Sequence, residues 1–451
     1  MIRAAFALIL TLLAVPAQAI EIQEVTSPGG IEAWLVEDHS IPFTALSLDF
    51  RGGASLDAPG KRGAINLMTA TLEEGAGKMD STAFAQEVEA LGAKLSFDAS
   101  DDALSIGFQS LTENRAESAD LLRLALTQPR FDADAIERVR AQVQAIIRAE
   151  ATEPQSIAAK EMAKQAWGDH PYGSSVNGTQ QSLAALTQQD LVAAKNRVLA
   201  RDRVLVGAAG DITAEELGLL LDEILGGLPE TGTAPLPDEA ELQLTPGVTV
   251  VDWDSPQTIV TFAGPGLPID DPDYFAATVA NHILGGGGFS SRMMDEIREK
   301  RGLTYGIGTG LATGIYGQTW AGGMASANEK VAEGVDLIRQ EWARMAEGVS
   351  DKELADAKTY LTGEYALRFD GNGKIAGILA GMQLIDLPVD YVNTRNGMVE
   401  AVTKEDVQRV AERLLDEGDL RFVLVGRPEG IADDSAAVEA GEDAAPAAQT
   451  N

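Results

Sequence analysis

Apolar residues recur along this chain with two different periods. Ile136, Val139, Val143 and Ile146 keep helical spacing, which places an apolar face along one helix. Shorter stretches are continuously apolar or alternate with polar residues, as β-strands do. The strands that these stretches predict lie at residues 43–50, 104–108, 204–206, 258–262 and 422–425. The mixture predicts an α+β fold in which helices cover a sheet.

The pattern also repeats. A Thr-x-x-Asp start, an amphipathic run and an apolar strand ending in glycine occupy residues 187–207 and again residues 403–426. A second pair of helices agrees, with Asp132 and Ser350 as the expected N-cap residues. We therefore expect two homologous halves, each a mostly antiparallel sheet covered by helices.

Three segments fall outside this repeat. The first nineteen residues carry Arg3, an apolar run and a small-x-small ending, which predicts a cleaved signal peptide. A proline-rich and acidic stretch predicts an exposed linker, and the C-terminal stretch has no apolar face and predicts a disordered tail. The expected organisation is a signal peptide at 1–19, an N-terminal half at 20–227, a linker at 228–247, a C-terminal half at 248–431 and an acidic tail at 432–451.

Composition narrows the possible functions. The 451 residues include no cysteine, so neither disulfides nor thiolate metal sites are available. A formal net charge of -34 disfavours nucleic acid as a partner; it serves solubility, or it steers cationic peptides. No segment after the signal has the roughly 18 apolar residues that membrane insertion needs. The chain is thus expected to be exported, with a periplasmic location.

One helix has the shape of a metal-site scaffold without its ligands. Around residues 63–74, Leu67 and Met68 belong to a packed face. Asn66 and Ala70 are four residues apart, so their side chains lie one above the other. A zinc peptidase would place two histidines at these two positions, and a carboxylate that acts as the general base at the position of Thr69.

Here the chain resembles the pitrilysin/insulinase family of zinc metallopeptidases, including its processing-peptidase branch, over residues 22–426. The family motif Gly-x-x-His-x-x-Glu-His aligns with Gly63 to Ala70, so that Asn66 and Ala70 replace the histidines and Thr69 replaces the base. The resemblance implies two halves that form a clamshell.

The family's third ligand is a glutamate on a later helix. The lead-in at 131–138 matches this chain and places the ligand position on Ile146, with Glu150 the nearest carboxylate downstream. Carboxamide, methyl and butyl groups do not make a zinc site. We therefore expect no metal and no other cofactor in this chain.

A second family signature runs from Leu284 to Tyr305. By resemblance, Arg298 and Tyr305 are the pair that reaches across the closed chamber to the substrate backbone at the zinc of the other half. A guanidinium and a phenol can hold a peptide carbonyl and stabilise an oxyanion. The alternative is that Arg298 is a solvated charge beside Glu299 and that Tyr305 packs at the start of a strand.

The glycine run in this signature comprises Gly285, Gly286, Gly287 and Gly288. It lacks the Lys-Ser/Thr that closes a phosphate-binding loop, so it does not predict nucleotide binding. It supplies backbone freedom at a helix entry, or it is a mobile loop that lines a peptide channel.

The remaining candidates have structural explanations. The loop at 170–173 and the Asn-Gly-Thr at 177–179 fit turn chemistry. His39 fits a turn between strands, and His282 fits a core position.

These observations favour a non-catalytic, substrate-binding subunit of a periplasmic heterodimeric zinc peptidase that acts on unstructured peptides. A homologous subunit would bring the zinc, and peptides would pair with an exposed sheet edge. The alternative is a structural or peptide-binding module with no proteolytic role. An active protease with an unorthodox metal site is the third reading.

Overall fold

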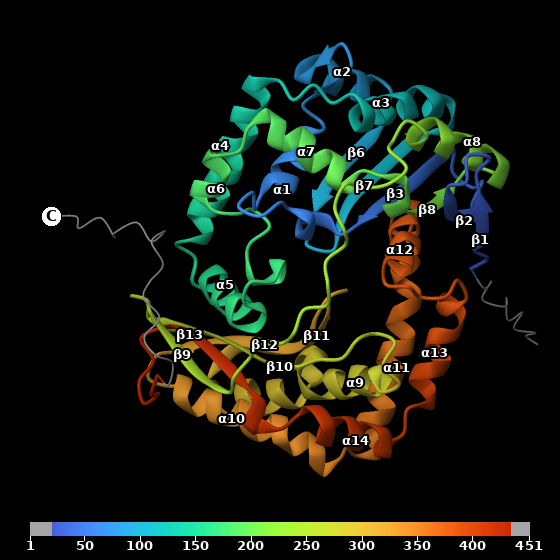
Figure 1. Ribbon diagram of the computed structural model, residues 1–451. Helices are drawn as coiled ribbons and strands as arrows, with labels where there is room; N and C mark the ends of the chain where they lie inside the picture. Colours follow the sequence, from blue (N-terminus) through green and yellow to red (C-terminus); the bar gives the residue numbers. More distant parts are fainter. Residues whose placement is uncertain (1–19, 434–451) are drawn as a thin grey trace, which may run out of the picture.

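The computed structural model describes residues 20–433. The expected signal peptide at 1–19 and the tail beyond residue 433 lie outside the described residues. The chain folds as two halves stacked on each other, each built around one sheet (Figure 1). Within residues 20–433, no helix combines the length and apolar character that a membrane span requires.

The N-terminal sheet has six strands. Across the sheet, these are β1 (Gln23–Thr26), β2 (Glu32–Glu37), β8 (Val204–Gly210), β3 (Phe43–Arg51), β7 (Ala103–Leu111) and β6 (Lys94–Ala99). β2 and β8 run parallel, and the other neighbours are antiparallel. β6 lies at one edge of the sheet.

The C-terminal sheet has five strands. Across the sheet, these are β9 (Gly247–Asp252), β13 (Arg421–Gly426), β10 (Gln257–Pro265), β12 (Gln318–Ala327) and β11 (Thr304–Thr313). β9 and β13 run parallel, and the other neighbours are antiparallel. β11 lies at one edge.

The two sheets have the same topology. Starting from the parallel pair, the order β2-β8-β3-β7-β6 in one half corresponds to β9-β13-β10-β12-β11 in the other, with equal strand directions. This correspondence confirms the predicted α+β fold of two homologous halves. It also makes the two edge strands, β6 and β11, equivalent to each other.

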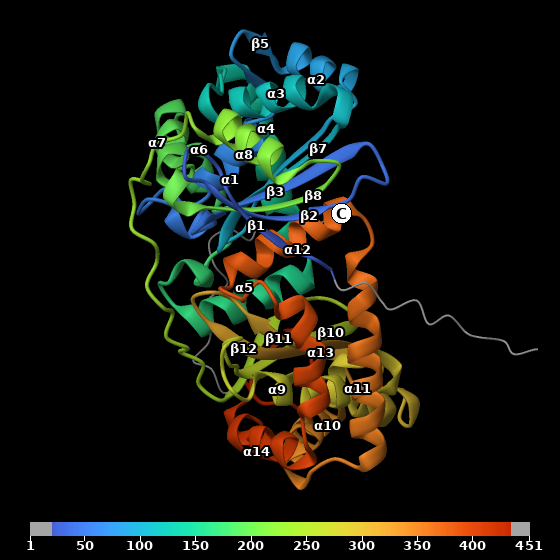
Figure 2. The same ribbon diagram turned by 90° about the vertical axis from the view of Figure 1, so that its right-hand side faces the viewer.

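Helices cover the outer face of each sheet, as Figures 1 and 2 show. On the N-terminal half these are α1 (Ala64–Thr71), α2 (Ser81–Ala90), α3 (Arg115–Thr127), α4 (Ala133–Glu150), α6 (Gln180–Ala184), α7 (Gln188–Val198) and α8 (Ala214–Leu225). On the C-terminal half these are α9 (Tyr274–Asn281), α10 (Val331–Arg344) and α14 (Lys404–Leu414), while α11 (Asp351–Tyr365) and α13 (Tyr391–Ala401) pack on each other and on α9 at the side of this half. Each half has its own apolar core between its helices and its sheet.

The two halves exchange one helix each across the space between them. α5 (Pro154–Trp167) belongs to the N-terminal half but packs on β10 and β13 of the C-terminal sheet. α12 (Asn372–Leu384) belongs to the C-terminal half but packs on β3 and β8 of the N-terminal sheet. Figure 2 shows both helices between the sheets. The inner face of each sheet is therefore covered by the other half.

The helix caps follow the sequence repeat with one exception. Thr187 and Thr403 form capping boxes at α7 and α14, and Ser350 forms one at α11. Asp132 is the N-cap residue of α4, as expected, but unlike these three residues it makes no side-chain capping hydrogen bond. Its side chain accepts a hydrogen bond from Arg130 Nε at 2.6 Å and makes none to the first turn of α4.

The segment at 228–247 has no helix or strand before β9, and most of its residues are exposed, as its composition predicts. Leu228 and Ala234 are buried. Gln243 N donates to Ala166 O at 2.8 Å, and Ala240 N donates to Tyr316 O at 2.5 Å. Backbone hydrogen bonds and two apolar contacts therefore fix this linker along both halves.

The two equivalent hairpins meet at their tips. The turn between β6 and β7 carries Asp102, whose carboxylate accepts from Ile315 N at 3.2 Å in the turn between β11 and β12. Tyr172 lies between these turns: its hydroxyl donates to Asp102 and accepts from Tyr316 N at 3.0 Å. The loop at 170–173 is a turn, as expected, and it also joins the two halves.

Candidate functional site

Helix α1 presents two side chains to the outside. Between Gly63 and Leu72, every residue is buried except Asn66 and Ala70, which are half-buried. These are the two positions at which zinc ligands are expected by resemblance. The four-residue spacing places both on one face, and the remaining faces of α1 pack into the core.

The other two expected positions lie in different environments. Thr69 is buried, and its Oγ1 has no hydrogen-bond partner among the described residues. Ile146 on α4 is 49% exposed, although it belongs to the apolar spacing that predicted this helix. Val139 and Val143 are buried as expected. Ile146 is therefore outside the core contact that its spacing suggests.

A chain of hydrogen bonds connects α1 with the end of α4. Asn66 Nδ2 donates to Asn177 Oδ1 at 2.8 Å, and Asn177 Nδ2 donates to Glu150 Oε1 at 3.0 Å. We call these three residues the amide chain. Sequence reasoning missed it, because an Asn-Gly pair predicts a turn, and the bond that Asn66 donates to Asn177 joins residues far apart in sequence.

The arrangement does not fit a zinc ion. Zinc needs three protein ligands from imidazole, thiolate or carboxylate. The site offers one carboxylate, Glu150, which already accepts a hydrogen bond from Asn177. Throughout residues 20–433, no group of three His, Cys, Asp or Glu side chains is placed to hold a metal ion.

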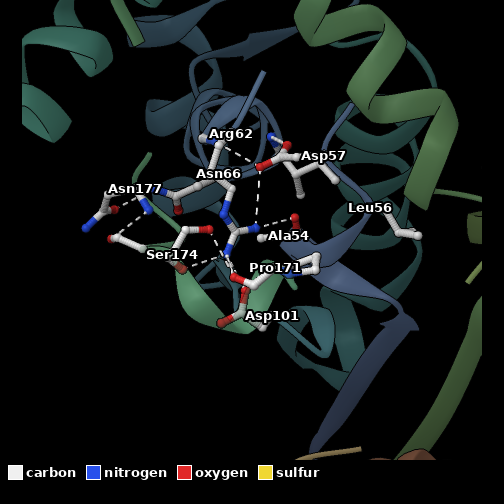
Figure 3. Close-up of polar contacts among 12 residues, drawn as sticks. Ala54, Leu56, Asp57, Arg62, Asn66, Asp101, Pro171, Ser174 and Asn177 are labelled. Carbon is white, nitrogen blue, oxygen red and sulfur yellow. Dashed lines mark hydrogen bonds and ion pairs between the residues drawn. The ribbon is translucent and has the colours of Figure 1, made fainter. Parts of the chain in front are cut away.

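Arg62 fixes the start of α1, as Figure 3 shows. Its guanidinium donates to the carbonyl oxygens of Ala54, Pro171 (3.1 Å) and Ser174 (3.0 Å) and to the Asp101 carboxylate. These partners come from three separate segments of the N-terminal half. The helix that carries Asn66 is thereby held in one position relative to the loop that carries Asn177.

A buried carboxylate completes this support. Asp57 accepts hydrogen bonds from Gly63 N and Ile65 N, both at 2.8 Å, at the first turn of α1. Burial raises the pKa of Asp57 to about 6, against the opposing effect of these two hydrogen bonds and of Arg62.

The C-terminal half carries a second cluster. The Arg298 guanidinium lies over the Phe289 ring at 4.6 Å and over the Tyr305 ring at 5.6 Å, measured to the centroids. Phe289 is 71% exposed and Tyr305 is 92% exposed. Arg298 also pairs with Glu299. The family signature predicted that Arg298 and Tyr305 act as a pair, but it did not predict that Phe289 lies with them.

The structure agrees in part with each of the two interpretations of Arg298 and Tyr305, as a substrate-binding pair and as a surface charge beside a packed tyrosine. Arg298 does lie beside Glu299, but its guanidinium also lies over two aromatic rings. Tyr305 stands at the start of β11 and is exposed rather than packed. Tyr305 is therefore open to a ligand, and the half-buried Arg298 is partly so.

The glycine run borders an open groove of about 590 Å³. Gly285, Gly286 and Gly288 line it together with residues 307–312 of β11. Gly285 is buried, and a Cβ there would lie 2.5 Å from Thr309 Oγ1, so this position needs glycine for close approach. Two nearby turns are π-helical, a form frequent at functional sites: His282–Gly286, which includes the first two glycines of the run, and Met294–Glu299, which follows it.

His282 and His39 have structural roles. His282 is buried beside Tyr360, and burial lowers its pKa. His39 lies in the turn before β3 and pairs with Asp211 at 2.7 Å, which raises its pKa. Both observations agree with the expected core and turn positions.

Comparisons with known proteins agree with this geometry. The model of the insulinase family (peptidase family M16) matches residues 33–180, and the model of the peptidase M16 inactive domain matches residues 185–361. A Helicobacter pylori relative named "Non-peptidase homolog YmxG" is 24% identical over 86% of this chain and 90% of its own. A probable mitochondrial-processing peptidase subunit beta of Schizosaccharomyces pombe is 27% identical over 68% of this chain and 70% of its own.

Solved structures give the same result. A peptidase M16 inactive domain from Pseudomonas fluorescens has a TM-score of 0.84 and 29% identity, covering 90% of this chain and 98% of its own. A chain of complex III2 from Candida albicans shares the fold, with a TM-score of 0.75 and 16% identity over 91% of this chain and 97% of its own. The chain therefore belongs to the insulinase family, peptidase family M16, as an inactive homologue.

Proposed function

We propose that this chain is the substrate-binding subunit of an exported, periplasmic zinc peptidase that works as a heterodimer. A homologous partner supplies the zinc helix. This chain supplies Arg298 and Tyr305 and part of the surface that holds the peptide.

One observation carries the proposal. The metal-ligand positions on α1 and α4 hold Asn66, Ala70 and Ile146, whereas the C-terminal half keeps Arg298, which is half-buried, and Tyr305, which is exposed. An arginine and a tyrosine that solvent can reach can donate to a carbonyl that is attacked at another subunit's metal. The named mitochondrial relative is a peptidase subunit, which supports action in a pair.

Stacking prepares Arg298 for this role. The rings of Phe289 and Tyr305 restrict the guanidinium, so less conformational entropy is lost when it binds a substrate carbonyl. Phe289 thus joins the proposed site as a positioning residue.

Two sheet edges can accept an unstructured peptide as an added strand. β6 and β11 each have a neighbouring strand on one side. On β11, added side chains at Gly306 and Gly310 would meet open space, so a peptide backbone can approach closely. Main-chain hydrogen bonds at such an edge supply affinity with little demand on sequence.

Reconstitution tests the proposal. The mature chain alone is expected to hold no stoichiometric zinc and to cleave no peptide, and adding the zinc-bearing partner is expected to restore cleavage. The Arg298→Ala substitution should then lower kcat/KM about a hundredfold, the loss expected for one oxyanion donor. Tyr305→Phe should also lower it.

Arg301→Ala is the matched control, because Arg301 pairs with Glu296 at 2.7 Å and does not contact either ring. It should leave kcat/KM within about twofold, as for a surface ion pair. Full activity of both the Arg298 and Tyr305 variants would remove their assigned role.

The second candidate function is a structural or peptide-binding module without a proteolytic role. This chain shares its fold with a chain of the Candida complex, and this likeness supports the second candidate function. Co-purification from the native host separates the two: a homologue with an intact His-x-x-Glu-His motif supports the peptidase, and an assembly without one supports the module.

A further inference from the structure

The amide chain holds the side chain of Asn66 in a defined orientation. Asn66 donates to Asn177, and Asn177 donates to Glu150, so each carboxamide is fixed by the next group. Gly63 and Gly178 allow this close seating: a Cβ on Gly63 would lie 2.7 Å from Asn177 O, and one on Gly178 would lie 2.3 Å from Arg62 O. The loop and the start of α1 are therefore packed backbone to backbone.

Asn66 keeps bonding capacity after this contact. A carboxamide has two N–H donors and an oxygen that accepts. Within residues 20–433, the bond to Asn177 is the one side-chain hydrogen bond that Asn66 makes. One N–H and the oxygen remain, and they match the C=O and N–H of a peptide link.

The surroundings of Asn66 suit a peptide. Ala70 lies one turn further along the same face of α1, and its methyl group takes less room than an imidazole. Ile146 and Glu150 lie one turn apart on one face of α4, and Ile146 is half exposed. An apolar side chain next to the bound link would cover Ile146 and gain the free energy of burial.

We infer that Asn66, fixed by Asn177 and Glu150, binds one peptide link of an extended peptide in the N-terminal half, with an apolar side chain of that peptide on Ile146. This inference rests on the proposed function for its ligand class, and it adds a second place where this chain itself holds the peptide. A carboxamide cannot polarise a carbonyl as a metal ion does. The site therefore binds a peptide link and leaves it intact.

The test is peptide binding by the purified mature chain without a partner. The probe is a fluorescein-labelled unstructured peptide of alternating leucine and serine, followed by fluorescence anisotropy. Asn66→Ala should raise the Kd about tenfold, which corresponds to about 1.4 kcal/mol. Asn177→Ala should raise it in the same direction, because it releases the Asn66 carboxamide. Ile146→Ser should weaken binding of the leucine-containing probe and leave the Kd of an all-serine probe unchanged.

Two controls keep the result interpretable. Asn66→Asp preserves side-chain volume but removes the N–H donors, so it should match Asn66→Ala even if the alanine variant is less stable. Asn196→Ala on α7 changes an asparagine with no side-chain hydrogen bond among the described residues and should leave Kd unchanged. Equal Kd values for wild type, Asn66→Ala and Asn66→Asp would overturn the inference.

This outcome is separate from that of the proposed function. Arg301→Ala, which lies outside both proposed sites, should leave binding by the chain alone within about twofold. Arg298→Ala tests the proposed function through the activity of the reconstituted pair. Binding that depends on Asn66, together with no activity in any pair, would retain this site and reject the peptidase role. If the reconstituted pair is active but peptide binding by the chain alone does not depend on Asn66, the peptidase role is retained and this site is rejected.

Discussion

At Asp57, a buried carboxylate caps a helix from outside its own first turn. Helix α1 follows Gly63, which has φ 95° and no side chain to serve as an N-cap. Asp57 supplies the acceptor for the N–H groups of Gly63 and Ile65 instead. These bonds and Arg62 do not fully offset the desolvation of the carboxylate, so its pKa lies above the ordinary value.

We expect Asp57 to affect how stability depends on pH. Its pKa is about 6 in the folded chain and 3.8 in the unfolded reference, so the folded state binds more protons between these values. Its contribution is therefore fully present below about pH 4 and declines as the pH rises through 6. Relative to Asp57→Asn, the wild type should lose on the order of 3 kcal/mol of unfolding free energy between pH 4 and 7.

Denaturant unfolding of both proteins at several pH values measures this difference. Other titrating groups contribute equally to the two proteins and cancel. Parallel curves across the interval would show that Asp57 titrates normally in the folded chain.

Sequence reasoning reached Asn66 and Ala70 because the helical period places residues four apart on one face. It could not show that the base position, Thr69, is fully buried, since burial depends on what packs around α1. It also missed Asn177 and Phe289, whose partners are distant in sequence or identified by ring geometry. The replaced positions could be predicted from the sequence, but the contacts that took their place could not.

At the scale of elements, the exchanged helix α12 lies unusually close to its sheet. A Cβ on Gly207 in β8 would be 2.0 Å from Ala376 O and 2.7 Å from Ala380 N. Ala45 and Ala209 are the other small buried residues on this face. The sheet is built of small residues here because a helix backbone lies directly on it.

Two glycine substitutions should therefore act in opposite directions. Gly207→Ala should destabilise the chain by about 3 kcal/mol, because the methyl group overlaps the backbone of α12. Gly377→Ala on α12 itself should stabilise it by about 0.5 to 1 kcal/mol, since its Cβ meets open space and alanine favours a helix. Thermal or denaturant unfolding of both variants measures the contrast, and a stable Gly207→Ala would mean that α12 is not seated on β8.

The strands and capping boxes could be predicted because their signals are local: alternation, apolar runs and Thr-x-x-Asp. The exchange of α5 and α12 could not. Both have ordinary helical sequences, and the spacing of apolar residues along a helix does not specify which sheet the helix will cover. In the linker, proline and acid content correctly predicted that most residues are exposed, but they did not single out Leu228 and Ala234, which are buried.

At the scale of the molecule, the contact between the hairpin tips limits movement of one half against the other. Gly314 and Gly317 in the β11–β12 turn lie so close to the N-terminal half that a Cβ would meet Tyr172 at 2.9 Å and Trp167 at 2.6 Å, respectively. Burial and Asp102 together raise the pKa of Tyr172, so its hydroxyl stays protonated and keeps donating.

Removing one hydroxyl should loosen this contact. Tyr172→Phe deletes the donor to Asp102 and the acceptor for Tyr316 N, so it should lower the unfolding free energy by about 1 to 3 kcal/mol. Amide hydrogen exchange should also accelerate at Ile315 and Tyr316. Tyr360→Phe, at an exposed tyrosine without a hydroxyl hydrogen bond among the described residues, should change neither quantity.

Unchanged exchange at Ile315 and Tyr316 in the Tyr172 variant would mean that the tips are held by other contacts. The repeat in the sequence predicted two halves of one fold. It did not predict how they meet, because the residues that join them are turn residues in both copies.

The crossing of α5 and α12 has a consequence for breakage of the chain. If a protease cut the polypeptide between residues 228 and 247, each fragment would still have one of its helices resting on the other fragment's sheet. The nicked protein should therefore elute as one species in gel filtration and separate in denaturant. Neither fragment expressed by itself should stay in solution, since each would leave the inner surface of its sheet bare.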